Sequence, residues 1–183
     1  FRGYQLVNLA EGLRSKRIGP ALASFAAVGI SSAVFGLAHA ANPHAGALST
    51  SNIAVAGLML AAGFVTTGEL AIPIGLHLGW NLAQNLLGMP VSGQTRFHFG
   101  RLAAREVAGG PEWLTGGGFG PEAGLTGLLA MVCGTAAILG WVRLRHGALR
   151  LRLRLGTTAP PPPTYEQTRN YRMDHEAAGP YMD

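Results

Sequence analysis

Three long stretches of the sequence carry no charged side chain. Residues 18–68, 70–95 and 123–142 contain no Asp, Glu, Lys or Arg, which gives runs of 51, 26 and 20 residues. A helix that crosses a bilayer needs about 20 mostly apolar residues. A soluble helix would instead carry charged side chains on an outer face at every turn or two. The runs therefore predict an all-α, multi-pass transmembrane helical bundle with about four spanning helices.

The basic side chains gather at the ends of these runs. The net charge is +5, and the basic clusters lie at residues 14–17 and 143–154. This is the distribution of loops that stay on the cytoplasmic side of a membrane, and it argues against a nucleic-acid partner. We expect residues 14–17 and 143–183 to be cytoplasmic. Thirteen of the 14 basic residues are Arg, which is typical of a high-GC bacterial genome and predicts the cell inner membrane.

Periodicity and helix-breaking residues divide the chain into segments. The predicted helical segments are the end of a fifth helix at residues 1–13 and spanning helices at residues 20–41, 52–65, 70–87 and 122–142. A Gly/Ser/Thr-rich connection is expected at 43–51 and a polar, Gly-rich loop at 91–122. We expect a transmembrane domain over residues 1–155 and a disordered, Pro-rich C-terminal tail over residues 156–183.

Leucine and arginine nearly alternate from Leu144 to Leu155. One interpretation is an arginine stripe that contacts anionic lipid headgroups. The simpler interpretation is a basic flank that only fixes the topology.

Two histidines lie inside the predicted spanning helices, where ionisable side chains are costly and often mark function. His39 closes the first predicted spanning helix. His77 lies in the third, with Asn81 four residues later on the same helix face. Gly75 and Gly79 form a small-residue pair that predicts close approach of another helix. Two imidazoles and an amide could position a water, ligate a metal and stabilise an oxyanion, although each histidine could also be a hydrogen-bonded packing residue.

The pattern around these residues resembles the intramembrane CAAX-protease and bacteriocin-processing (CPBP) family. That family carries Glu-Glu-x-x-x-Arg, Phe-x-x-x-His and His-x-x-x-Asn in order. Here Phe35 to His39 fits the second motif and His77 to Asn81 the third, while Arg2, followed by Gly-Tyr, fits the end of the first. The Gly-rich loop at 111–122 is also similar to bacterial members, so the resemblance covers residues 1–142.

The resemblance implies an intramembrane endopeptidase that hydrolyses a peptide bond of a membrane-embedded or lipid-anchored protein or peptide within the lipid bilayer. It gives water activation to a motif-one glutamate, and it has His39 and His77 hold that water or a divalent metal such as zinc. It also implies that Asn81 stabilises the oxyanion and that Arg2 orients the glutamates.

Both motif-one glutamates would fall upstream of Phe1. We therefore expect an N-terminally truncated domain, and we expect this fragment to be inactive because it lacks its general base. Two other functions stay open. One is a non-catalytic membrane protein, such as a bacteriocin-immunity protein or scaffold, and the other is a membrane protein that binds haem through His39 and His77.

Overall fold

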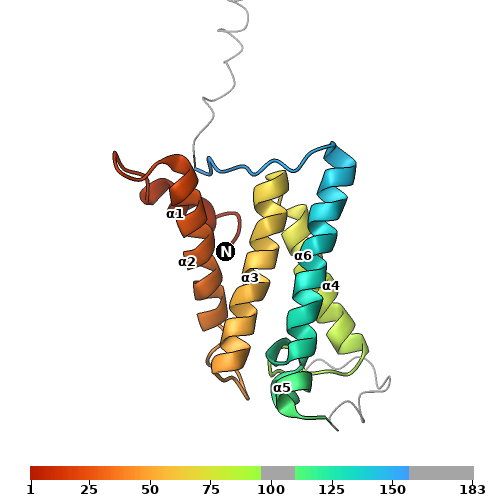
Figure 1. Ribbon diagram of the computed structural model, residues 1–183. Coiled ribbons are helices and arrows are strands. Elements are labelled where there is room, and N and C mark those ends of the chain that lie inside the picture. Colours follow the sequence, from red (N-terminus) through yellow and green to blue (C-terminus); the bar gives the residue numbers. More distant parts are fainter. Residues whose placement is uncertain (96–109, 157–183) are drawn as a thin grey trace, which may run out of the picture.

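The computed structural model describes residues 1–95 and 110–156, and the regular elements in this part of the chain are helices, apart from one isolated β-bridge between Val91 and Gln94. Its helices, in chain order, are α1 (Gln5–Gly12), α2 (Pro20–Leu37), α3 (Ala47–Thr67), α4 (Ala71–Leu86), α5 (Glu112–Thr115), η2 (Gly117–Phe119), η3 (Pro121–Ala123) and α6 (Leu125–His146). The long helices run up and down beside one another, with α1 across one end (Figure 1). The predicted helical membrane bundle is confirmed.

Three helices, α2, α3 and α6, are long and apolar enough to cross a membrane. The fourth apolar helix, α4, has 16 residues. At 1.5 Å per residue that is about 24 Å, short of the roughly 30 Å hydrocarbon thickness. Within the described residues, three of the predicted spanning helices therefore reach the length of a membrane span. The predicted fifth helix is α1, which begins at Gln5, so Arg2 lies before a helix and not within one.

Local backbone chemistry moves several predicted boundaries. The predicted connection at 43–51 is largely helical, because α3 begins at Ala47. Its start is fixed by Ser49, whose hydroxyl accepts a hydrogen bond from the Gly46 N–H at 2.8 Å. At the other end of the preceding loop, α2 stops at Leu37, so His39 lies in a turn beyond the helix.

Helix α3 is the centre of the bundle, and α2, α4 and α6 all pack against it. The closest approach is at Gly36 on α2, where an added Cβ would lie 2.6 Å from the Thr50 carbonyl oxygen of α3. Only glycine permits that contact, which brings the end of α2, and therefore Phe35 and His39, against α3.

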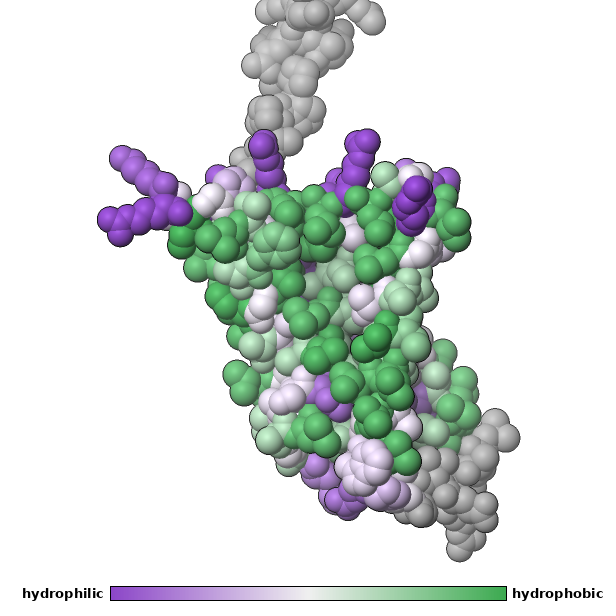
Figure 2. Space-filling model, in the orientation of Figure 1, coloured by the Kyte–Doolittle hydropathy of each residue, from purple (hydrophilic) through white to green (hydrophobic). Residues whose placement is uncertain are grey.

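Apolar and charged side chains occupy different parts of the outer surface. Apolar side chains cover the body of the bundle, and charged side chains project from the end where α1 and the last turn of α6 lie (Figure 2). Residues 14–17 and 143–154 therefore share one end; its cytoplasmic orientation stays a prediction. The expected helix contact at Gly75 and Gly79 was wrong within the described residues, because a Cβ at either position would meet nothing within 4 Å.

Candidate functional site

Phe35 brings the two predicted histidines together. The His39 ring packs edge-on against the Phe35 ring, with centroids 4.9 Å apart. The His77 ring, from α4, packs against the same ring at 5.7 Å. Phe35 is buried on α2, His39 is half-buried just beyond that helix, and His77 is exposed on α4. Segments 38 residues apart in the sequence thus present two imidazoles at one pocket.

A backbone carbonyl defines the tautomer of His39. Nδ1 of His39 lies 2.7 Å from the Phe35 carbonyl oxygen. A carbonyl can only accept, so Nδ1 carries the proton and donates it. In the neutral ring Nε2 then keeps a lone pair, which can accept a hydrogen bond from water.

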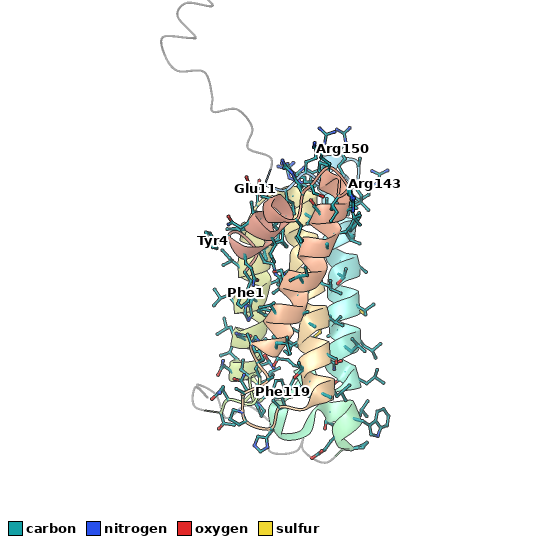
Figure 3. The ribbon with its side chains drawn as sticks, turned by 90° about the vertical axis from the view of Figure 1, so that its left-hand side faces the viewer. Phe1, Tyr4, Glu11, Phe119, Arg143 and Arg150 are labelled. Atoms are coloured by element: carbon teal, nitrogen blue, oxygen red, sulfur yellow. The ribbon has the colours of Figure 1, made fainter. Side chains whose placement is uncertain are left out.

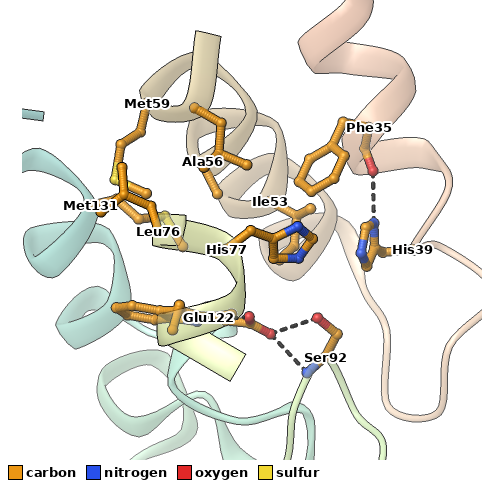
Figure 4. A pocket seen from close by; sticks show the side chains of 12 residues that line it. Phe35, His39, Ile53, Ala56, Met59, Leu76, His77, Ser92, Glu122 and Met131 are labelled. Atoms are coloured by element: carbon orange, nitrogen blue, oxygen red, sulfur yellow. Dashed lines mark hydrogen bonds between the residues drawn. The ribbon is translucent and has the colours of Figure 1, made fainter. Parts of the chain in front are cut away.

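Glu122 supplies a buried carboxylate at the same pocket (Figure 4). It is 4% exposed. Its Oε1 accepts a hydrogen bond from the Trp80 indole at 2.9 Å, and its Oε2 accepts from both the N–H and the hydroxyl of Ser92 at 2.7 Å. Trp80 lies one helical turn after His77, so this carboxylate ties the His77 segment of α4 to the start of α6.

Further hydrogen bonds hold the loop at residues 90–94, which contacts this carboxylate through Ser92. The Asn42 amide donates to the Ser92 carbonyl at 2.9 Å, which links the His39 turn to the Glu122 clamp. The Gln84 amide donates to the Pro90 carbonyl at 3.1 Å. Both histidine-bearing segments are therefore anchored to the loop at 90–94.

The space between these groups is small. The cavity measures about 30 Å³, room for one or two water molecules. Its lining combines the two histidines, Glu122 and Ser92 with the apolar side chains of α3, and Leu76 and Met131 close its far side. Such a site can hold and polarise water in a largely apolar surrounding.

Arg2 lies beside this pocket, with its guanidinium 5.4 Å from the centre of the Phe35 ring. The residue is 6% exposed. Its Nη1 donates to the Ser31 hydroxyl at 3.1 Å. Within the described residues, Nε and Nη2 find no hydrogen-bond partner. A buried guanidinium with two unsatisfied nitrogens calls for an anionic partner.

Asn81 is half-buried, one turn beyond His77 on α4. Its backbone carbonyl accepts a hydrogen bond from the Asn85 amide at 2.8 Å. The residues that line the pocket include His39 and His77 but not Asn81.

The donor set does not fit the expected metal. A catalytic zinc ion takes three protein ligands. No group of three His, Cys, Asp or Glu among residues 1–95 and 110–156 is arranged to hold a metal ion. Both oxygens of Glu122 already accept hydrogen bonds, so this carboxylate is not free to complete a ligand set with the two histidines. The small cavity also has no room for a porphyrin, which removes the support for axial haem ligation.

Glu122 is the site residue that the sequence interpretation missed. It had been placed at the start of a spanning helix, but the structure puts it in η3, before α6 begins at Leu125. The available signals were an acid directly before an apolar run and an indole donor three residues after His77. Of the other histidines, His44 and His146 are exposed, and His98 lies outside the described residues.

The loop that carries Glu122 depends on Gly120. This residue has φ +103°, and an added Cβ would lie 2.3 Å from the Pro90 carbonyl oxygen. We expect Gly120→Ala to lower the free energy of unfolding by about 2–4 kcal/mol, because strain and overlap add. Gly140→Ala is the control, since a Cβ there meets nothing within 4 Å and alanine favours a helix. Thermal unfolding in detergent compares the two variants, and equal midpoints would contradict the expectation.

A family model for Rce1-like proteins, described as type II CAAX prenyl endopeptidase Rce1-like, matches residues 1–83. Neither a curated protein nor a solved structure matches the chain. The matched range contains both histidines, Asn81 and Arg2, and it ends before Glu122. Residues 1–83, which hold the histidine motifs and the buried arginine in the family's order, are thus similar to the Rce1-like CAAX-protease family.

Proposed function

We propose that the chain is an intramembrane endopeptidase and that the pocket around Phe35 is its reaction centre. The observation that carries this proposal is the meeting of His39 and His77 at one small polar cavity in an otherwise apolar bundle. His39 Nε2 and the His77 ring hold the attacking water beside the scissile carbonyl. Fixed imidazoles in an apolar surrounding orient a water more strongly than bulk solvent does.

A carboxylate that pairs with Arg2 is the proposed general base. Arg2 has two buried nitrogens without a partner within the described residues and lies beside the pocket, so an acid bound there would face the same water. The resemblance assigns this role to a glutamate upstream of Phe1. Glu122 is less suited to accept the proton, because both of its oxygens are already engaged as acceptors by Trp80 and Ser92.

Glu122 is instead the proposed positioning residue for His77. It fixes Trp80, one turn beyond His77, and its negative charge favours any positive charge that develops on the imidazoles. Asn81 is the proposed oxyanion donor, which requires the scissile carbonyl to enter along α4. The substrate is a membrane-embedded or lipid-anchored peptide, because the exposed His77 lies on an apolar helix whose outer side faces lipid.

The test is peptide cleavage in proteoliposomes. Substrates are a peptide with a farnesylated C-terminal CAAX sequence, the same peptide without the lipid, and a single transmembrane peptide. Mass spectrometry of the released fragments identifies the cleaved bond. Residues 1–183 are compared with a form extended upstream of Phe1, and His39→Ala/His77→Ala is the inactive control.

We expect cleavage by the extended form and none by the double variant. Cleavage that survives the double variant would overturn the assignment of the pocket. Full activity of residues 1–183 alone would show that the general base is one of these residues. Lack of cleavage of all three substrates by a folded, extended form would favour a non-catalytic partner or scaffold.

A further inference from the structure

The chain after α6 folds back across one end of the bundle. Helix α6 ends at His146, and Gly147 reverses the backbone with φ +73°. Residues 148–156, here called the strap, then cross from α6 towards α1 and α2 (Figure 1). The Leu/Arg alternation that the sequence displays at 149–155 therefore lies in an extended segment and not in a helix.

Specific contacts hold the strap in place. The Arg152 N–H donates to the Val65 carbonyl near the end of α3 at 2.7 Å. The Leu155 N–H donates to the buried Ser24 hydroxyl of α2 at 3.3 Å. The Leu155 side chain is 8% exposed and packs in an apolar cluster with Leu6 of α1, Ala27 of α2 and Phe64 of α3. A basic flank that only fixes the topology would need none of these hydrogen bonds. The strap is therefore an ordered part of the fold.

Alternation in an extended chain places successive side chains on opposite faces. Leu155 is buried and Leu153 half-buried, whereas Arg150, Arg152 and Arg154 are exposed. The arginines thus project from the end of the bundle while some leucines turn inward. Arg152 also lies against Gly68, directly after α3, where a cation is favoured by the helix dipole.

Positive charge dominates this whole end. The exposed basic residues here are Arg14, Lys16, Arg17, Arg143, Arg145, Arg150, Arg152 and Arg154. The exposed acids are Glu11 and Glu69. Figure 3 shows Glu11, Arg143 and Arg150 at this end and Phe119 at the opposite one. The charge excess lies where the apolar body stops, at the level of the lipid headgroups.

A hollow lies beside the strap and combines apolar walls with a basic rim. Its volume is about 720 Å³, and it is lined by Pro20, Ala21, Phe64, Gly68 and residues 151–156. Phe64 and Leu151 offer surface to a hydrocarbon chain, and the Arg152 side chain offers donors to a phosphate. Soluble acidic partners would use the basic rim and leave the apolar walls exposed.

We propose that the strap and this hollow form a binding site for one anionic phospholipid. The headgroup phosphate pairs with Arg152 at the rim, and an acyl chain lies along Phe64 and Leu151. This site is separate from the reaction centre and does not depend on the proposed function.

The experiment measures lipid retention by native mass spectrometry of residues 1–183 in detergent, titrated with phosphatidylglycerol or with phosphatidylcholine of the same chain length. We expect one phosphatidylglycerol to bind at least tenfold more tightly than phosphatidylcholine. Arg152→Gln should weaken phosphatidylglycerol binding about tenfold. The matched control Arg14→Gln removes equal charge at the same end but outside the hollow, and should weaken phosphatidylglycerol binding less than threefold.

Equal losses of affinity in Arg152→Gln and Arg14→Gln would overturn the site, because they would indicate only diffuse electrostatic attraction. Equal affinity for the two lipids, or displacement of the lipid by glycerol 3-phosphate at comparable concentration, would also overturn it. The unfolding temperature in phosphatidylcholine alone checks that each variant folds.

Discussion

Replacing His39 with alanine should lower kcat/KM for the membrane peptide by roughly a thousandfold, within the range of roughly 10²–10⁴ for loss of a positioned acid–base group. The variant removes the Nε2 lone pair that faces the cavity, because Nδ1 is held by the Phe35 carbonyl. The rate is measured in proteoliposomes. The protein is either residues 1–183 or the form extended upstream of Phe1, depending on which of them cleaves the peptide.

Stability should change little in the same variant. His39 lies in a turn after α2 and is half-buried. Its one hydrogen bond contributes about 1 kcal/mol. His146→Ala is the matched control, because this exposed histidine lies in the last turn of α6, and its kcat/KM should stay within about twofold of the parent. A His39→Ala protein that unfolds at the parental temperature and still cleaves normally would remove His39 from the mechanism.

Replacing Glu122 with alanine should have the largest effect on the fold and abolish activity with it. The change leaves the Trp80 indole and both donors of Ser92 without their acceptor. Each unsatisfied buried donor costs about 1–3 kcal/mol, so the free energy of unfolding should fall by about 3 kcal/mol or more. Glu112→Ala is the control, because Glu112 is exposed in the same loop, and its effect should stay within about 0.5 kcal/mol.

Glu122→Gln separates positioning from stability. The glutamine oxygen can still accept from Trp80, but its NH₂ would face the Ser92 N–H, donor against donor. We expect a smaller loss of stability than in Glu122→Ala and a fall in kcat of about 100-fold, since a displacement of about 1 Å near the reaction can cost that much. Trp80→Phe, which keeps the carboxylate and loses one donor, should retain more activity than Glu122→Gln. The reverse order would show that the charge does not matter.

Charge distribution alone predicted the helical bundle, because a hydrocarbon environment excludes charged side chains from long segments. It could not predict the length of α4, since a short apolar helix packed on α3 carries the same composition as a spanning one. The end of α2 was placed four residues late for a related reason. Residues 38–41 are apolar apart from His39, and nothing in their composition separates a turn from a helix.

The two histidines were identifiable because ionisable side chains stand out in apolar runs. Glu122 was not, because it sits at the edge of such a run, where an acid is ordinary. Its importance depends on Trp80 and Ser92, 42 and 30 residues away, and no local pattern carries that information. Hydrogen bonds between residues far apart in the chain are the part of a site that a single sequence does not predict.

The position of Phe35 gives a physical meaning to the Phe-x-x-x-His spacing. Four residues place this ring one turn before His39, so that one residue supplies both the carbonyl that orients the imidazole and the ring on which it rests. The same ring contacts His77 from α4 and the guanidinium of Arg2. Phe35 is therefore a shared support, and a change at this one ring would shift both imidazoles together.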